Sequence, residues 1–394
     1  MKTLDLPKQS FTGIRRPPWR DRLDTWLDRW MTSQTLYQWT SRNVLTRWVT
    51  RRRAKQVFDL MAGFVYTQVL LACVRLKILE MVCETPRTLQ ELANQCQVPA
   101  SALQRLLESA RALGLLEWRG GQRYGLGPLG APVAGHAGIR AMIEHHSVLY
   151  QDMSDPVALL TDTLPAAQMA EYWPYAKPRP THANSAGWQA DKIARYSELM
   201  SASQPFVVDE VLASYAFAEN QCVLDVGGGQ GTFIGRLAKH APHLKLKLFD
   251  LPQVADLARQ KLSQEALAGR LEISGGDFLK DDLPQGADLV TLIRIAHDHP
   301  DDHVRKILAA IYKALPVGGT LLLAEPMAQD AEEEPLGDAY FHFYLLAMGS
   351  GRLRTVQELM DMMAEAGFSH LEPLPNPMPL QTRILLGRKA KYLP

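Results

Sequence analysis

A glycine-rich turn in the second half of the chain carries the strongest chemical signal. The segment CVLDVGGGQGTFIG begins with an apolar strand that ends near Asp225, turns through Gly227 and Gly229, and enters a helix. Glycines permit such a turn and let backbone N–H groups approach a ligand closely. Thr232 takes the third glycine position of a dinucleotide-binding GxGxxG pattern, and the lysine of a nucleoside triphosphate loop is absent. The acid before the turn therefore suits a cationic, amino-acid-like ligand better than a pyrophosphate.

Further polar and aromatic groups follow at the ends of later apolar runs. Asp250 comes 25 residues after the acid of the turn, and a carboxylate at this place can accept both hydrogen bonds of a ribose diol. Asp277 and Phe278 in GGDF offer a polar group for an exocyclic amine and a ring for an adenine face. LIRIAHDHP then places Arg294 and His297 after the fourth run.

A parallel sheet would bring these groups to one edge. From Asp191 onward strands and helices alternate, which predicts an α/β domain with a doubly wound, mostly parallel sheet and helices on both faces. The expected strands are residues 222–226, 244–249, 271–275, 289–293 and 320–324, with a terminal pair near 371–373 and 381–387. Catalytic groups then lie just past the carboxyl ends of the strands.

The first half of the chain has a helical and then a winged pattern. Residues 57–82 predict two helices that meet near Val69, followed by helices over 87–97 and 98–116 and a hairpin around Gly120 and Gly121. The helix over 98–116 offers few groups to DNA, so a structural role is favoured. The expected domains are an arm over 1–56, a helical winged-helix domain over 57–190 and a catalytic domain over 191–394, with a connection or flap over 172–187.

Together these motifs resemble the class I S-adenosylmethionine-dependent methyltransferases. The layout of residues 57–390 resembles their small-molecule O-methyltransferase branch, in which a winged-helix dimerisation domain precedes the methyl-donor fold. The resemblance implies a homodimer, with S-adenosyl-L-methionine as donor and S-adenosyl-L-homocysteine as product. It also implies these donor-binding residues: Asp225, Gly227, Gly229, Asp250, Leu251, Asp277, Phe278 and Arg294.

The same resemblance makes His297 the general base. The sulfonium donor already carries a good leaving group, so the enzyme must chiefly align the acceptor oxygen and take its proton, as a neutral imidazole can near pH 7. Glu325 in LLLAEPM resembles the acid that orients this base. Plant-type members carry a second acid where GRLRT has Leu353, so the base is less strongly supported or its surroundings are drier. His299 and His303 are expected at surface or capping positions, and no metal is expected.

Long apolar segments are candidates for the acceptor site, although such stripes also form cores. Polar side chains within them give the acceptor-contact candidates His145, His146, Tyr150, Tyr340 and His342. The segments RYGLGPLGAPVAG and MIEHHSVLYQD resemble the bacterial hydroxycarotenoid O-methyltransferases of the hydroxyneurosporene and demethylspheroidene type. This resemblance implies a lipophilic acceptor, the tertiary hydroxyl at the end of a long polyene.

Other functions fit the same motifs. A phenol, polyketide or indole acceptor would need a smaller pocket, and C-methylation of a bacteriochlorophyll-type ring is a further variant. A winged-helix regulator that uses the methyl-donor fold as a sensor is disfavoured by the acidic body and the weakly basic recognition helix, so no nucleic acid partner is expected.

The N-terminal arm differs from the rest of the chain in composition. Residues 1–56 hold thirteen Lys and Arg against four Asp, a net charge of +9 in a chain of net charge +1, and five of the eight tryptophans. Such a mixture suits an anionic membrane interface, and it equally suits packing on the body or on a partner subunit. Scattered cysteines and the polar start favour a cytoplasmic protein, and the apolar run over 60–74 is expected to form a buried helix.

Overall fold

The computed structural model describes residues 18–164, 168–172, 204–205, 207–263, 267, 269–329, 336–379 and 382–390. The chain forms two compact units, residues 1–70 and residues 71–394. Residues 173–203 lie outside the described ranges, and with them most of the predicted connection at 172–187 and the predicted domain boundary at 191.

The first unit consists of helices α1 (Pro18–Met31), α2 (Gln34–Arg42) and most of α3 (Arg47–Arg75). The predicted helix break near Val69 is wrong, because α3 continues to Arg75 and the chain turns at Lys77, which has a φ of 53°. No glycine or proline interrupts residues 64–75, so nothing in the local sequence ends the helix earlier.

The expectation that the apolar run over 60–74 is buried is also wrong for the single chain. Only Leu71, Cys73 and Val74 of α3 are buried, whereas Leu60 and Phe64 are 84% and 70% exposed. Within the part of the chain that the structure describes, α3 is the one helix that passes for a membrane span by length and composition. The described residues leave this apolar helix face uncovered, and an exposed apolar face of this size is typical of a surface that another molecule covers.

A winged-helix module opens the second unit, as predicted. Its elements are α4 (Ile78–Glu84), β1 (Arg87–Thr88), α5 (Leu89–Cys96), α6 (Ala100–Ala112), β2 (Leu116–Arg119) and β3 (Arg123–Leu126). The strands pair antiparallel in the order β1-β3-β2. Thr88 and Glu91 form a capping box that starts α5. On α6, Arg111 pairs with Glu108 of the same helix.

Short helices connect this module to the sheet domain. They are α7 (Gly130–Gly135), α8 (Ala137–Asp152), α9 (Pro156–Leu160) and α10 (Gln168–Tyr172), and α15 (Leu336–Met348) packs against α8, α9 and α10. The Asp152 carboxylate accepts the N–H groups of Gln168 and Met169 at the start of α10, 2.7 and 2.8 Å away. A cluster of apolar side chains joins these helices: Leu149, Leu159, Met169, Tyr344, Leu345, Ala347, Met348 and Leu353. We call it the acceptor-side cluster.

The predicted sheet is present, and all seven expected strands are found. They are β4 (Cys222–Val226), β5 (Lys245–Asp250), β6 (Leu271–Gly275), β7 (Leu289–Ile293), β8 (Thr320–Glu325), β9 (Ser369–Leu374) and β10 (Arg383–Arg388). Their order is β6-β5-β4-β7-β8-β10-β9, parallel except that β10 runs antiparallel to both of its neighbours. The doubly wound fold places the ends of β4, β5, β7 and β8 at one edge.

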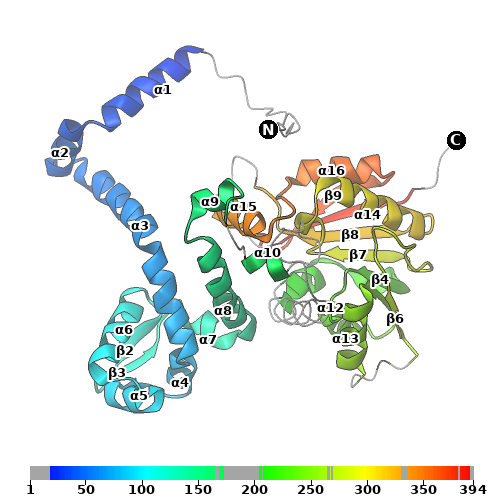
Figure 1. The fold of residues 1–394 in the computed structure, drawn as a ribbon, viewed down its shortest axis with the longest axis horizontal. Helices are drawn as coiled ribbons and strands as arrows, with labels where there is room; N and C mark the ends of the chain where they lie inside the picture. The colour runs from blue at the N-terminus through cyan, green and yellow to red at the C-terminus, as the bar shows by residue number, and fades with distance from the viewer. Residues whose placement is uncertain are drawn as a thin grey trace. The chain divides into compact units, whose positions relative to one another are not determined.

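Side-chain alternation in the central strands builds two cores. In β4, Leu224 and Val226 belong to a core with α14 (Asp301–Ala314) and α16 (Val356–Glu365), whereas Val223 belongs to a core with α12 (Thr232–His240) and α13 (Pro252–Leu262). Figure 1 shows these two helix pairs on opposite faces of the sheet. Both faces are covered, so the central strands β4, β7 and β8 are buried along their whole length and are mostly apolar. Two 3₁₀ turns complete the unit, η1 (Phe217–Glu219) and η2 (Ala296–Asp298).

Candidate active site

The glycine-rich turn forms a tight link between β4 and α12. Gly227, Gly229 and Gly231 all have positive φ, at 71°, 57° and 78°. A Cβ on Gly227 would lie 2.4 Å from Ile295 Cδ1, so this position is filled by the protein itself. A Cβ on Gly229 would meet nothing within 4 Å, so Gly229 borders open space at the end of the sheet.

Two carboxylates lie beneath this turn, of which Asp225 is buried and Asp250 is half-buried. Asp225 accepts a 2.7 Å hydrogen bond from Thr291 Oγ1, and Asp250 accepts the N–H groups of Gly229 and Leu251, each at 2.7 Å. Burial raises the pKa of Asp225 to about 7 and that of Asp250 to about 6. Among the described residues, no lysine or arginine forms an ion pair with either carboxylate. Two acids, one buried and one half-buried, with no basic partner among the described residues fit a cationic ligand such as a sulfonium amino acid.

Asp277 and Phe278 follow β6, as expected, but their surroundings differ. Asp277 accepts hydrogen bonds from Leu279 N–H and Lys280 Nζ. Burial pushes its pKa up, yet these bonds outweigh burial, and the pKa of Asp277 is lowered overall. Phe278 is buried in the core, with its ring edge-on to His299 at 5.4 Å between centroids. Sequence reasoning did not find this packing contact.

Arg294 directly follows β7 and has a backbone conformation that is rare outside glycine. Its φ is 58°, and its N–H donates to Ala324 O of the neighbouring strand at 2.8 Å. Burial lowers the pKa of His145 on α8, and the positive charges of His146 and Arg294 add to this lowering.

His297 lies in η2 with a carboxylate on each side of its ring. Its Nε2 is 3.1 Å from Asp298 Oδ1, its Nδ1 is 3.5 Å from Glu325 Oε2, and the ring is 3% exposed. The backbone N–H of His297 also donates to Glu325 Oε2, at 3.0 Å. Burial raises the pKa of Asp298. A proton taken up by this imidazole would be stabilised by two adjacent carboxylates.

The residue at the place of the second supporting acid is apolar. Leu353, in the GRLRT segment, is buried and belongs to the acceptor-side cluster. The expectation for His299 is wrong: it is fully buried, and burial lowers its pKa to about 3. Its ring packs edge-on against Phe278, a member of the apolar core that also includes Ala296 of η2. Within the described ranges, no group of three or more potential metal ligands is found.

Four of the five predicted acceptor contacts come together on α8 and α15. His146 Nε2 is 2.7 Å from Tyr340 Oη, and the rings of His146 and Tyr150 lie 6.4 Å apart. His145 Nε2 is 3.2 Å from Oη of Tyr344, a residue that sequence reasoning missed. Burial lowers the pKa of His145 to about 4 and also lowers that of His146, so both rings are neutral at pH 7.

His342, the fifth candidate, does not join this group. It is exposed, and it lies between Tyr340 and Tyr344 in sequence, on another face of α15. The helical spacing of 340 and 344, four residues apart, is the signal that could have found Tyr344 and removed His342.

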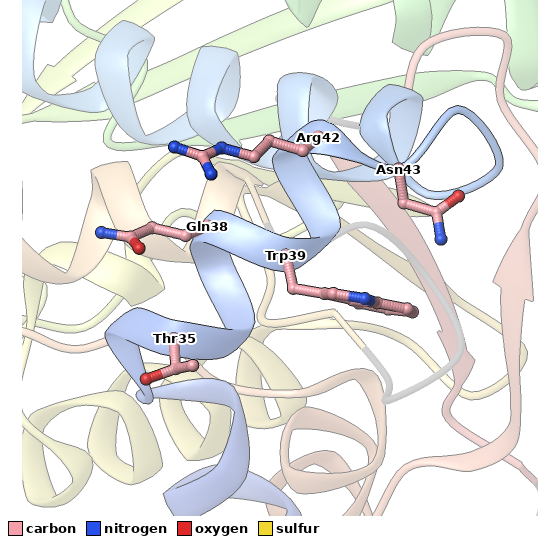
Figure 2. Close-up of a pocket in the computed structure, with 5 residues that line it drawn as sticks. All are labelled: Thr35, Gln38, Trp39, Arg42 and Asn43. Atoms are coloured by element: carbon pink, nitrogen blue, oxygen red, sulfur yellow. The ribbon is translucent and has the colours of Figure 1, made fainter.

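The N-terminal unit has a separate hollow of about 420 Å³ beside α2, lined by Thr35, Gln38, Trp39, Arg42 and Asn43. Figure 2 shows Gln38 and Arg42 directed to one side of the helix, and Trp39 and Asn43 to the other. No residue of α2 is buried, so this hollow has no fixed polar group that could orient a substrate. The strand-end residues described above form the better candidate for an active site.

Comparisons with known proteins agree with this fold. The family model for the O-methyltransferase domain matches residues 159–369, and that for the O-methyltransferase dimerisation domain matches residues 58–132. The second match includes the exposed apolar part of α3.

Two curated relatives are each 38% identical to this chain. Demethylspheroidene O-methyltransferase of Cereibacter sphaeroides aligns over 84% of this chain and 86% of its own length, and that of Rhodobacter capsulatus over 91% and 88%. Human N-acetylserotonin methyltransferase, solved in complex with S-adenosylmethionine, shares the fold with a TM-score of 0.70 at 22% identity, over 86% of this chain and 98% of that one. This chain therefore belongs to the S-adenosylmethionine-dependent O-methyltransferases that carry an N-terminal dimerisation domain and act on small molecules.

Proposed function

We propose that this enzyme methylates the tertiary hydroxyl at the end of a 1-hydroxycarotenoid. The observation that carries the proposal is the 38% identity, over most of both chains, to two demethylspheroidene O-methyltransferases. The acceptor-contact candidates His146 and Tyr340 lie on α8 and α15, the helices that the acceptor-side cluster joins, so a lipophilic acceptor there would meet apolar side chains.

The donor site in this proposal is the edge formed by β4, β5 and β7. Gly227 and Gly229 would border the methionine part of S-adenosyl-L-methionine, and the open space at Gly229 leaves room for it. Asp250 would accept the ribose hydroxyls, and its bonds to the Gly229 and Leu251 N–H groups hold it in place. Asp225 would supply negative charge beneath the turn. When bound, the donor supplies an electrophilic methyl group and leaves as a neutral thioether.

Two further groups complete this donor site. Asp277 would face the adenine amine, while Phe278 would contribute from the core beneath it rather than as an open stacking face. Arg294 would line the site between the donor and the acceptor helices.

Proton removal is assigned to His297. A neutral imidazole would accept the hydroxyl proton as the oxygen attacks, and the resulting cation would lie between Glu325 and Asp298. Glu325 also accepts a hydrogen bond from the backbone N–H of His297, and this bond helps to hold the His297 ring next to the Glu325 carboxylate. General-base catalysis of this kind supplies about 10² to 10⁴-fold in rate.

The acceptor hydroxyl would be oriented by the polar groups of α8 and α15. The pairs His146–Tyr340 and His145–Tyr344 offer neutral donors and acceptors next to the apolar cluster. We retain four of the proposed acceptor contacts: His145, His146, Tyr150 and Tyr340. We do not retain His342, because its side chain is exposed and lies on another face of α15.

We also propose a peripheral contact between the arm and an anionic membrane, with the enzyme otherwise cytoplasmic. Trp19, Trp26 and Trp30 lie on one face of α1 and are 60%, 59% and 52% exposed. The net charge of +9 over residues 1–56 complements anionic lipid headgroups. A membrane contact would bring the enzyme to the bilayer in which a carotenoid resides.

Single-turnover transfer of labelled methyl from S-adenosyl-L-methionine tests the acceptor. The panel consists of 1-hydroxycarotenoids in liposomes, beside catechols and hydroxyindoles. We expect label in the carotenoids, with transfer by the His297→Ala variant about 10² to 10⁴-fold slower. Label in the phenols or indoles alone would overturn the carotenoid acceptor and leave the family, donor and fold unchanged.

Liposome flotation tests the arm. The full chain should float with vesicles that contain anionic lipid and not with zwitterionic ones. A variant with serine at positions 19, 26 and 30 should lose flotation, whereas Trp118→Ser, which changes an exposed tryptophan outside the arm, should not. Equal flotation of all three proteins would remove the membrane contact from the proposal.

A further inference from the structure

The segment from Ser350 to Arg354 packs directly against the turn that carries His297. Ser350 Oγ donates to Asp298 O at 2.9 Å, and the backbone N–H of Arg352 donates to His297 O at 3.0 Å. Gly351 approaches so closely that a Cβ there would lie 2.0 Å from His297 O. These contacts join main-chain atoms of the turn to a segment more than 50 residues later in the chain.

Arg354 makes the most extensive of these contacts. Its guanidinium is fully buried, with Nη1 donating to Ala296 O and Nη2 donating to His299 O, both at 2.8 Å. One carbonyl precedes His297 and the other follows Asp298. A single planar, rigid group therefore fixes both ends of the turn on which the base lies.

A buried cation needs a counter-charge, and Asp301 provides it. Arg354 Nε and Nη2 donate to Asp301 Oδ1 at 3.0 and 2.7 Å. Arg352 adds two bonds to the same carboxylate, at 2.9 and 3.0 Å. Burial would raise the pKa of Asp301, but the bonds from both arginines outweigh burial and lower it to about 2. The carboxylate thus stays ionised at any working pH, and the guanidinium of Arg354 stays paired.

We propose that Arg354 is a positioning residue for methyl transfer: through the carbonyls of Ala296 and His299 it holds the His297 ring where it can reach the acceptor proton. The inference rests on the proposed function of His297 as the base. Arg354 itself contacts backbone and Asp301, so it acts through His297. A misplacement of about 1 Å at a reacting group costs about 10²-fold in rate, which sets the size of the expected effect.

Arg352 offers a matched control. It binds the same Asp301 carboxylate through its side chain, yet its side-chain bonds go to Asp301, Glu358 and Leu353 O, none of which belongs to the turn. Its bond to His297 O uses the backbone and survives substitution. Arg354→Lys and Arg352→Lys therefore both weaken the Asp301 pairing, but only the first loosens the turn.

The test compares kcat, acceptor KM, donor affinity and melting temperature for the full-chain variants. We expect Arg354→Lys to lower kcat about 10²-fold, with acceptor KM and donor Kd within about threefold of wild type. Arg352→Lys should change kcat less than about threefold. Equal kcat losses in the two variants would overturn the proposal, because the Asp301 pairing alone would then explain the effect.

A double variant separates positioning from general stability. In a His297→Ala background, Arg354→Lys should not lower the residual rate further, because the base it positions is gone. An additional 10²-fold loss there would refute positioning through His297. If His297→Ala alone retains wild-type turnover, the base assignment fails instead, so the two failures are distinguishable.

Ser350→Ala covers the case in which Arg354→Lys does not fold. It removes one hydroxyl bond to Asp298 O from a part-buried site. We expect a smaller fall in kcat, of about five- to tenfold, that again disappears in the His297→Ala background. An unchanged kcat in Ser350→Ala, together with a misfolded Arg354→Lys, would assign this segment to folding and overturn its role in positioning.

Discussion

Replacement of His297 by alanine removes the proposed base while keeping its support. The backbone N–H of His297 donates to Glu325 Oε2, 3.0 Å away. The Arg354 guanidinium donates to the carbonyls of Ala296 and His299. All of these survive the substitution. The variant therefore lacks the imidazole, but η2 should keep its shape.

The expected loss follows from the position of the ring. The imidazole lies 3.1 and 3.5 Å from two carboxylates that would stabilise its protonated form. Loss of a general base costs about 10² to 10⁴-fold, which corresponds to about 2.7–5.4 kcal/mol of activation free energy. Donor affinity should stay within about threefold, because no donor-site residue changes.

Single-turnover methyl transfer at saturating donor and acceptor measures the chemical step. Calorimetric titration with S-adenosyl-L-methionine gives donor affinity and the active fraction, which corrects for any protein lost to misfolding. His342→Ala is the matched control, since it truncates an exposed histidine of the same domain and should leave kcat unchanged. A His297→Ala rate within threefold of wild type would refute the base assignment, and a parallel loss of donor binding would indicate a collapsed turn.

Three further predictions concern the donor site. The pKa of Asp225 is about 7 in the folded protein and 3.8 ordinarily, so ionisation of this carboxyl disfavours folding. The donor-free wild type should therefore lose stability relative to Asp225→Asn as pH rises from about 4 to about 7. A difference in urea midpoint between the two proteins that does not change with pH would contradict this. The pKa of Asp250 is about 6, so the donor affinity of the wild type, measured by calorimetry, should fall as pH drops from 8 to 5. Asp250→Ala should bind the donor weakly at every pH. A donor affinity of Asp250→Ala equal to that of the wild type would overturn the ribose assignment. Gly227→Ala should destabilise the protein by more than about 1–2 kcal/mol, because a positive φ is combined with a clash at Ile295. Gly229→Ala should lose donor binding with a smaller fall in melting temperature. A larger fall in melting temperature for Gly229→Ala than for Gly227→Ala would be inconsistent with the described turn.

The strands of the sheet domain could be predicted because the local sequence of each strand indicates that it is buried. Residues 222–226 and 289–293 are apolar runs bounded by turn residues, and both are buried along their whole length. Residues at strand ends, such as Asp250 and Glu325, could be placed at the same edge because parallel strands share a direction.

Features that depend on distant contacts could not be predicted. The exposed face of α3 reads as buried because its residues are apolar, and composition alone does not tell what covers a helix. His299 reads as polar and exposed, yet its ring packs against Phe278 in the core. Arg354 carries no local signal, because its partners are Ala296, His299 and Asp301, more than 50 residues away in the chain.

The main-chain anchoring of η2 has a consequence for how such an enzyme can change over generations. The bonds of Glu325 and Arg354 hold peptide groups rather than the imidazole, so the architecture of the loop does not depend on the side chain at position 297. After gene duplication, one substitution at position 297 could exchange the proton acceptor of one enzyme copy. That enzyme would still fold and bind its donor. Heritable change in chemistry is thereby uncoupled from heritable change in shape for side chains other than proline that fit the buried space of the imidazole.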